Sequence, residues 1–169
     1  MATGVREGRV RIALAGAAVA ILVVGTPRSG SAQQGVPNFS GVWVNVPGTS
    51  QPPQLPSVGP IRITQGRATV SITAGRVATT AIYRLDGIPT ENTRMSGGQA
   101  RKVTSTARWT SAKLVVTDQD TLWKHETTYS FDESGSGLLV VVSSSTGLYE
   151  RGALTVGTIG PFTRIYRRH

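Results

Sequence analysis

The chain has 169 residues, 18 Lys and Arg against 9 Asp and Glu, a net charge of +9 and no cysteine. The lack of cysteine excludes disulfides, thiolate metal sites, a cysteine nucleophile and a lipid-modified cysteine at an export-signal cleavage site. One domain is expected, because a chain of this length buries roughly two-thirds of its unfolded surface around a single core.

The first 32 residues have the pattern of an export signal. Three arginines precede an apolar run of 14 residues, 12–25, and small residues occupy positions 30–32. A membrane-spanning helix needs roughly 20 apolar residues, so the run favours a cleaved signal over an anchor. We expect cleavage after Ala32, which leaves one secreted or periplasmic domain, residues 33–169.

Basic residues remain in excess once the leader is removed, with 14 Lys and Arg against 8 Asp and Glu, a balance of +6. They are scattered and have no interleaved aromatic residues, so no nucleic-acid partner is expected. Such a surface is compatible with contact to an anionic envelope polymer.

Short β-strands are predicted along the rest of the chain. Residues 39–46 are rich in β-branched and aromatic residues, and residues 47–60 hold five prolines, which predicts a long surface loop. Residues 88–99, with one proline and two glycines, are predicted to be irregular. Further strands are predicted at residues 61–65, 68–73, 77–85, 101–109, 113–117, 122–131, 138–143, 149–156 and 162–167.

No window of residues 33–169 shows a helical period, so the sequence predicts an all-β fold. Consecutive strands with tight turns favour an antiparallel up-and-down β-barrel of about 8–10 strands, because closure removes the exposed sheet edges. An antiparallel β-sandwich is the alternative.

Residues 122–131 alternate between two faces. One face is mostly polar. The other face combines aromatic side chains with a few polar groups, as ligand pockets do. The same residues would also suit a packed core. The candidate ligand-binding residues on this face are Trp123, His125, Thr127, Tyr129 and Phe131.

The opening F-x-G-x-W, with Gly41 and Trp43, resembles the G-x-W motif in the first strand of lipocalins and the wider calycin superfamily. It is similar also to uncharacterised small secreted bacterial proteins with the same opening, a proline-rich loop and pieces like residues 83–87, 107–116 and 128–139. The lipocalin resemblance implies that Trp43 plugs the barrel and that an arginine of the last strand, Arg164 or Arg167, packs on it.

Groups for catalysis are sparse in the sequence. His125 has no evident partner, Ser143, Ser144 and Ser145 lack a nucleophile elbow, and the acids at 118, 120, 132 and 133 suit turns. We therefore expect no enzyme, no metal and no cofactor.

The sequence thus favours a monomeric, non-enzymatic binding protein for a small apolar or amphipathic ligand. The alternative is a structural or interaction protein of the cell envelope with a filled barrel and a basic surface. A cavity of at least about 300 Å³ would favour binding.

The leader gives the first testable prediction. Protein recovered from the medium or periplasm of its host is expected to begin at Gln33, which N-terminal sequencing measures. Protein that keeps Met1 and remains in the membrane fraction would contradict cleavage.

Overall fold

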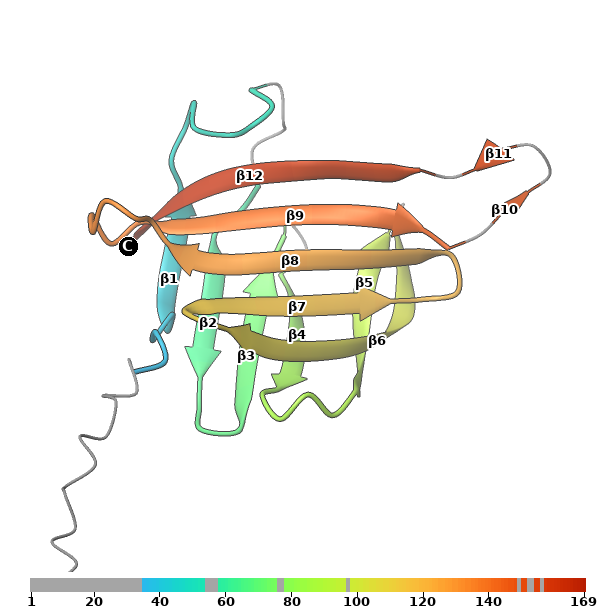
Figure 1. Cartoon of the computed structure of the whole chain (residues 1–169), viewed down its shortest axis with the longest axis horizontal. Coiled ribbons are helices and arrows are strands. Elements are labelled where there is room, and N and C mark those ends of the chain that lie inside the picture. The colour runs from blue at the N-terminus through green and yellow to red at the C-terminus, as the bar shows by residue number, and fades with distance from the viewer. Residues whose placement is uncertain are drawn as a thin grey trace, which may run out of the picture. The chain divides into compact units, whose positions relative to one another are not determined.

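Ten β-strands form one antiparallel sheet that curls into a nearly closed barrel (Figure 1). The structure is a computed structural model and describes residues 35–53, 58–75, 78–96, 98–148, 150–151, 154–155 and 157–169. The expected leader and its cleavage site lie outside these residues. No helix in the described ranges is long and apolar enough to cross a membrane.

The strands follow one another along the chain, and the connection between the first two is the long proline-rich one. A small hairpin of β10 (Glu150–Arg151) and β11 (Leu154–Thr155) separates the last two strands of the barrel. The barrel strands are β1 (Gly41–Asn45), β2 (Ile61–Gln65), β3 (Thr69–Ala74), β4 (Thr79–Arg84), β5 (Thr90–Ser96), β6 (Gln99–Thr110), β7 (Lys113–Gln119), β8 (Trp123–Phe131), β9 (Leu139–Gly147) and β12 (Thr158–Arg168).

The first and last strands pair, and this pairing makes the sheet a barrel. The strand order is β4-β3-β2-β1-β12-β9-β8-β7-β6-β5, so the two ends of the sheet, β4 and β5, are neighbours in the chain. The register places Trp43 of β1 opposite Arg168 of β12. The predicted antiparallel up-and-down barrel is confirmed.

Residues 88–99 were expected to be irregular, and this expectation is wrong, because β5 occupies seven of them. Pro89 lies just before the strand, and Gly98, with φ at 79°, lies in the turn that follows it. The inward side chains of β5 include Asn92 and Arg94, so the strand lacks the apolar alternation that marks a half-buried strand.

The end of β9 also differs from the expectation. Strand β9 runs on to Gly147 through three serines, four residues beyond the predicted end, because ladder pairing with β8 and β12 holds these polar residues in the sheet. The proline-rich loop is tied to the barrel by Gln51, whose backbone N–H and C=O both bond Thr163 of β12, at 2.8 and 2.9 Å.

Aromatic side chains fill one end of the barrel around Trp43, which is fully buried. Its indole Nε1 donates a hydrogen bond to the backbone oxygen of Phe39 at 2.8 Å. The ring of Phe131 lies 4.9 Å from that of Phe39 and 6.0 Å from that of Trp43, between ring centroids, and Trp109 stacks on Phe39 at 5.8 Å. This cluster closes the end of the barrel with packed rings.

The arginine over Trp43 is Arg168, whose guanidinium carbon lies 4.9 Å from the ring centroid. The sequence prediction of Arg164 or Arg167 is therefore corrected. Arg167 is exposed, and Arg164 lies four residues earlier on β12, opposite Val141. Gly41 makes room for the contact, because a Cβ there would lie 3.3 Å from Arg168 Nε, and its φ of 146° favours glycine.

Replacing Trp43 with alanine is expected to lower the free energy of unfolding by about 3–5 kcal/mol, the usual cost of truncating a buried aromatic residue. Urea denaturation measures this change. Trp123→Ala is the matched control, because Trp123 is only half-buried and lies outside the aromatic cluster, so a smaller loss is expected. A loss below about 1 kcal/mol for Trp43→Ala would place Trp43 at the surface.

Candidate functional site: a polar-lined cavity inside the barrel

A cavity of about 450 Å³ lies inside the barrel, beyond the aromatic cluster. This volume is within the range of roughly 300–1,000 Å³ that is typical of small-molecule sites. Its walls combine apolar side chains with a few polar ones from opposite sides of the sheet. The apolar lining includes Ile61, Ile72, Ala81, Val103, Val116 and Val141, and the polar lining includes Tyr83, Asn92, Arg94, Asp118, Thr127, Tyr129, Ser143, Arg164 and Tyr166.

The candidate ligand-binding face of β8 turns into the barrel, but only part of it borders the cavity. Thr127 and Tyr129 line the cavity. Phe131 instead packs in the aromatic cluster. Trp123 stacks on His125 at 6.3 Å between ring centroids, beyond the cavity lining.

Arg164 brings an unsatisfied donor to the cavity. Its Nε atom is buried and has no hydrogen-bond partner among the described residues. An unpaired buried donor on a charged group is costly, so such a group is satisfied when an acceptor occupies the space beside it. Arg164 also has no acidic partner among the described residues, so it brings a positive charge without a counter-ion to the lining of the cavity.

Three buried tyrosines line the same cavity as Arg164, among them Tyr129 and Tyr166. Burial raises the pKa of Tyr166 to about 12, although the charge of Arg164 opposes the shift. Burial also raises the pKa of Tyr129, and the neighbouring Tyr166 adds to the effect. Both hydroxyls therefore keep their protons at neutral pH and can donate hydrogen bonds.

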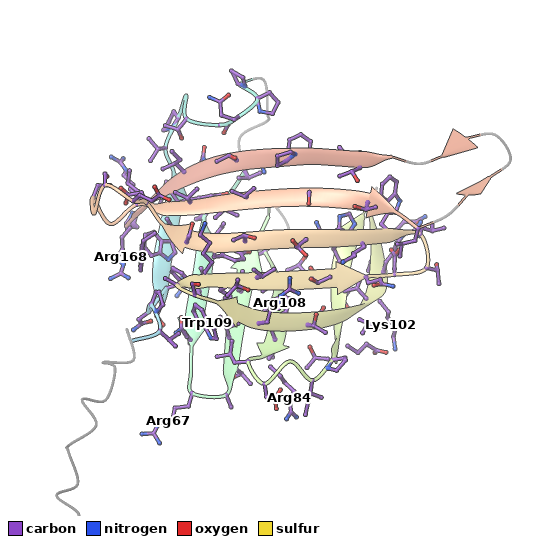
Figure 2. All side chains as sticks on the ribbon, in the orientation of Figure 1. Arg67, Arg84, Lys102, Arg108, Trp109 and Arg168 are labelled. Carbon is purple, nitrogen blue, oxygen red and sulfur yellow. The ribbon has the colours of Figure 1, made fainter. Side chains whose placement is uncertain are left out.

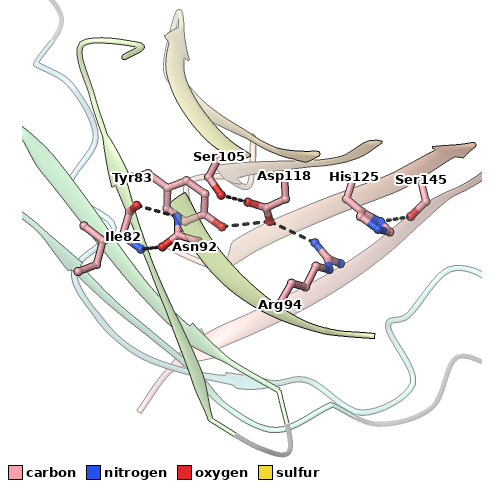
Figure 3. A network of polar contacts seen from close by, with 8 residues as sticks. All are labelled: Ile82, Tyr83, Asn92, Arg94, Ser105, Asp118, His125 and Ser145. Atoms are coloured by element: carbon pink, nitrogen blue, oxygen red, sulfur yellow. Dashed lines mark hydrogen bonds and ion pairs between the residues drawn. The ribbon is translucent and has the colours of Figure 1, made fainter. Parts of the chain in front are cut away.

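Asp118 lies at the centre of a buried polar network (Figure 3). Its carboxylate accepts hydrogen bonds from Ser105 Oγ at 2.6 Å, Arg94 Nη1 at 3.2 Å and Tyr83 OH at 3.3 Å. Burial, and next the charge of Asp118, raise the pKa of Tyr83, so that its hydroxyl remains a donor. The carboxylate is thus satisfied, and it neutralises Arg94.

The charges of the cavity do not balance. Among the described lining residues, Arg94 and Arg164 are the cations and Asp118 is the anion. Since Asp118 pairs with Arg94, Arg164 remains as one net positive charge in a wall that is about half apolar. The cavity is therefore complementary to a small molecule that is apolar and carries an acidic group.

His125 and Ser145 form a separate pair on neighbouring strands, with 2.6 Å between Nδ1 and Oγ. Burial, and next the charge of Arg94, lower the pKa of His125, which favours the neutral ring. Asp118 lies opposite His125 in the register, but its oxygens are engaged by the three donors named above. The pair therefore lacks the carboxylate orienter of a catalytic triad in the described part of the chain.

The sequence interpretation missed most of the polar lining. It assigned Asp118 and Asp120 together to a turn, which holds for Asp120, the acceptor of the Leu122 and Trp123 N–H groups at 2.7 Å each. Asp118 belongs to β7, where it continues the inward alternation of Leu114 and Val116. That alternation was the available signal.

Basic side chains on the outside of the barrel are dispersed, as Arg67, Arg84, Lys102 and Arg108 show in Figure 2. Arg84 pairs with Asp86 at 2.5 Å, Lys102 with Glu91 at 2.8 Å, and Arg108 with Glu126 at 3.9 Å. These exposed pairs contribute little to stability, but they reduce the positive potential of the surface.

No protein-family model and no curated protein matches the chain. Solved structures do match. A point variant of the fluorescent protein UnaG has a TM-score of 0.50 at 19% identity over 78% of this chain and 96% of its own. Wild-type UnaG has a TM-score of 0.49 at 18% identity over 78% of this chain and 97% of its own. The first likeness shows the fold alone, an antiparallel β-barrel.

The three buried tyrosines predict a loss of stability at high pH. Their pKa values are raised on folding, whereas unfolded tyrosines ionise near pH 10. Their stabilisation is therefore complete below about pH 10 and is lost as the pH rises from there towards the folded values.

Each tyrosine should account for about 1 kcal/mol of lost stability by pH 11. Urea denaturation at pH 8 and pH 11 measures the loss, and Tyr129→Phe should show a smaller one than the unaltered protein. Equal losses in both proteins would contradict a role for Tyr129.

Proposed function

We propose that this protein binds a small amphipathic molecule with an acidic group inside its barrel and performs no reaction on it. The observation that carries the proposal is the positive charge of Arg164, which lines the cavity and has no acidic partner among the described residues. A carboxylate or sulfonate group on the ligand would pair with the guanidinium of Arg164 and balance the charge.

The cavity supports binding over the alternative of a structural envelope protein with a filled barrel. Its volume of about 450 Å³ suits an acyl chain or a small ring system. Tyr129 and Tyr166, both protonated at neutral pH, can donate further hydrogen bonds to the acidic group. The apolar lining would bury the remainder of the ligand, as in other small-molecule sites.

We also propose that the protein acts outside the cytoplasm. The export-signal pattern of residues 1–32 supports a secreted or periplasmic protein, which would meet its ligand outside the cytoplasm. The dispersed basic surface would allow only weak contact with an anionic polymer of the envelope, because several of its cations already have acidic partners.

A pair of ligands that differ only in the head group tests the proposal. Displacement of the fluorescent anion 1-anilinonaphthalene-8-sulfonate gives the affinities for dodecanoate and dodecanol. Dodecanoate should bind about tenfold more tightly than dodecanol, because only the acid satisfies Arg164. Equal affinities would contradict the assigned role of the acidic group.

Arg164→Met, which keeps most of the aliphatic length, should remove this preference and leave the affinity for dodecanol within about threefold. Arg167→Met is the matched control, since it removes the same charge from an exposed position of the same strand and should retain the preference. An equal loss for both ligands in Arg164→Met would indicate a structural role for Arg164.

A further inference from the structure

The barrel has a seam between β4 and β5. All other neighbouring strands of the ten-stranded sheet are joined by backbone ladders, whereas these two, both fully described, are not. They are consecutive in the chain and lie beside one another. The seam is therefore the place where the wall lacks continuous backbone hydrogen bonding.

The cavity reaches this seam. Four consecutive residues of β5, from position 92 to position 95, line it, together with Thr79 and Ala81 of β4. A strand within a continuous sheet presents only alternate residues to one side. Thr93 and Met95 are exposed and alternate with the inward side chains, so the cavity extends past the free edge of β5 to the outside.

Asn92 closes part of the seam with its side chain (Figure 3). Its Oδ1 accepts a hydrogen bond from the backbone N–H of Ile82 at 2.8 Å, and its Nδ2 donates one to the backbone oxygen of Ile82, also at 2.8 Å. The hydroxyl of Thr90 donates to the same oxygen at 2.9 Å. The amide group thus takes the place of one rung of a backbone ladder.

Three exposed apolar side chains lie along the outer edge of the seam, among exposed polar residues. Ile82 and Ile88 are each 52% exposed, and Met95 is 37% exposed. These side chains come from β4, from the connection between the strands and from β5. An amphipathic molecule would find apolar contacts at the seam before it reaches the interior.

We infer that the ligand enters and leaves through the seam between β4 and β5, and that Asn92 is the clasp that holds the seam closed. The inference rests on the proposed function, since it supposes a ligand in the cavity. Water can replace the two amide hydrogen bonds of Asn92 at this exposed position. Separation of any other pair of strands would instead break a backbone ladder.

The clasp predicts a change in binding rates. Asn92→Leu has a similar size but no hydrogen-bonding groups, so it should open the seam without emptying the site. In stopped-flow fluorescence with 1-anilinonaphthalene-8-sulfonate, association and dissociation rate constants should both rise about fivefold or more. Rate constants equal to those of the unaltered protein would overturn the entry route.

Thr80→Val is the matched control. It removes an exposed hydrogen bond of 2.7 Å between Thr80 and Thr73, at the opposite edge of β4, and should leave both rate constants unchanged. The same acceleration in this variant would show that general loosening of β4, rather than the clasp, controls the rates, and would overturn the role of Asn92.

Amide hydrogen exchange tests the clasp without any ligand. In Asn92→Leu the Ile82 amide should exchange about tenfold or more faster, while amides in the ladder between β2 and β3 keep their protection. Unchanged exchange at Ile82 would overturn the clasp. If Ile82 exchanges faster but the probe does not bind even the unaltered protein, the clasp stands, and the proposed function and the entry route fail.

Discussion

Pairing of the first strand with the last is the constraint on which the barrel depends. An antiparallel meander leaves its first and last strands as exposed edges. Pairing of β1 with β12, in which Trp43 lies opposite Arg168, removes both edges. Gly41 permits the close approach of Arg168, and the indole of Trp43 is fixed by the backbone of Phe39. Because closure occurs there, the remaining discontinuity of the sheet falls in the middle of the chain, between β4 and β5.

The interior is divided between packing and cavity. At the closed end, rings from β1, β6, β8 and the segment before β1 fill the space, and the buried indole N–H of Trp43 has a hydrogen-bond partner. Farther along the same strands, the inward positions hold tyrosines, arginines and small residues. Asp118 has three donors, whereas Arg164 Nε has no partner in the described residues. The packed aromatic end stabilises the fold, and the cavity with its arginine is the part that can bind a ligand.

The fold was predictable from the periodicity of the side chains along the chain. The alternation of residues 122–131, the series of consecutive short strands and the lack of helical periodicity were sufficient for an antiparallel barrel. Strand β5 was missed because its inward residues are polar, and a polar strand in the wall of a cavity has the composition of a loop. The arginine over Trp43 was misassigned because neighbouring positions of β12 face in different directions, and only the register selects Arg168. Cross-strand geometry of this kind is not visible in strand composition.

The polar network also bears on how the seam would open. Asp118 Oδ2 accepts from Tyr83 of β4 and from Arg94 of β5, so the two sides of the seam are joined from within as well as by Asn92 at the edge. A charged donor bonds a carboxylate more strongly than a neutral hydroxyl does. Arg94 therefore holds β5 to β7 by a charged hydrogen bond, whereas β4 is tied to β7 by the neutral hydroxyl contact at 3.3 Å. Each strand also keeps its own ladder, β5 with β6 and β4 with β3. Opening would accordingly displace β4 and leave β5, Arg94 and the rest of the cavity wall in place.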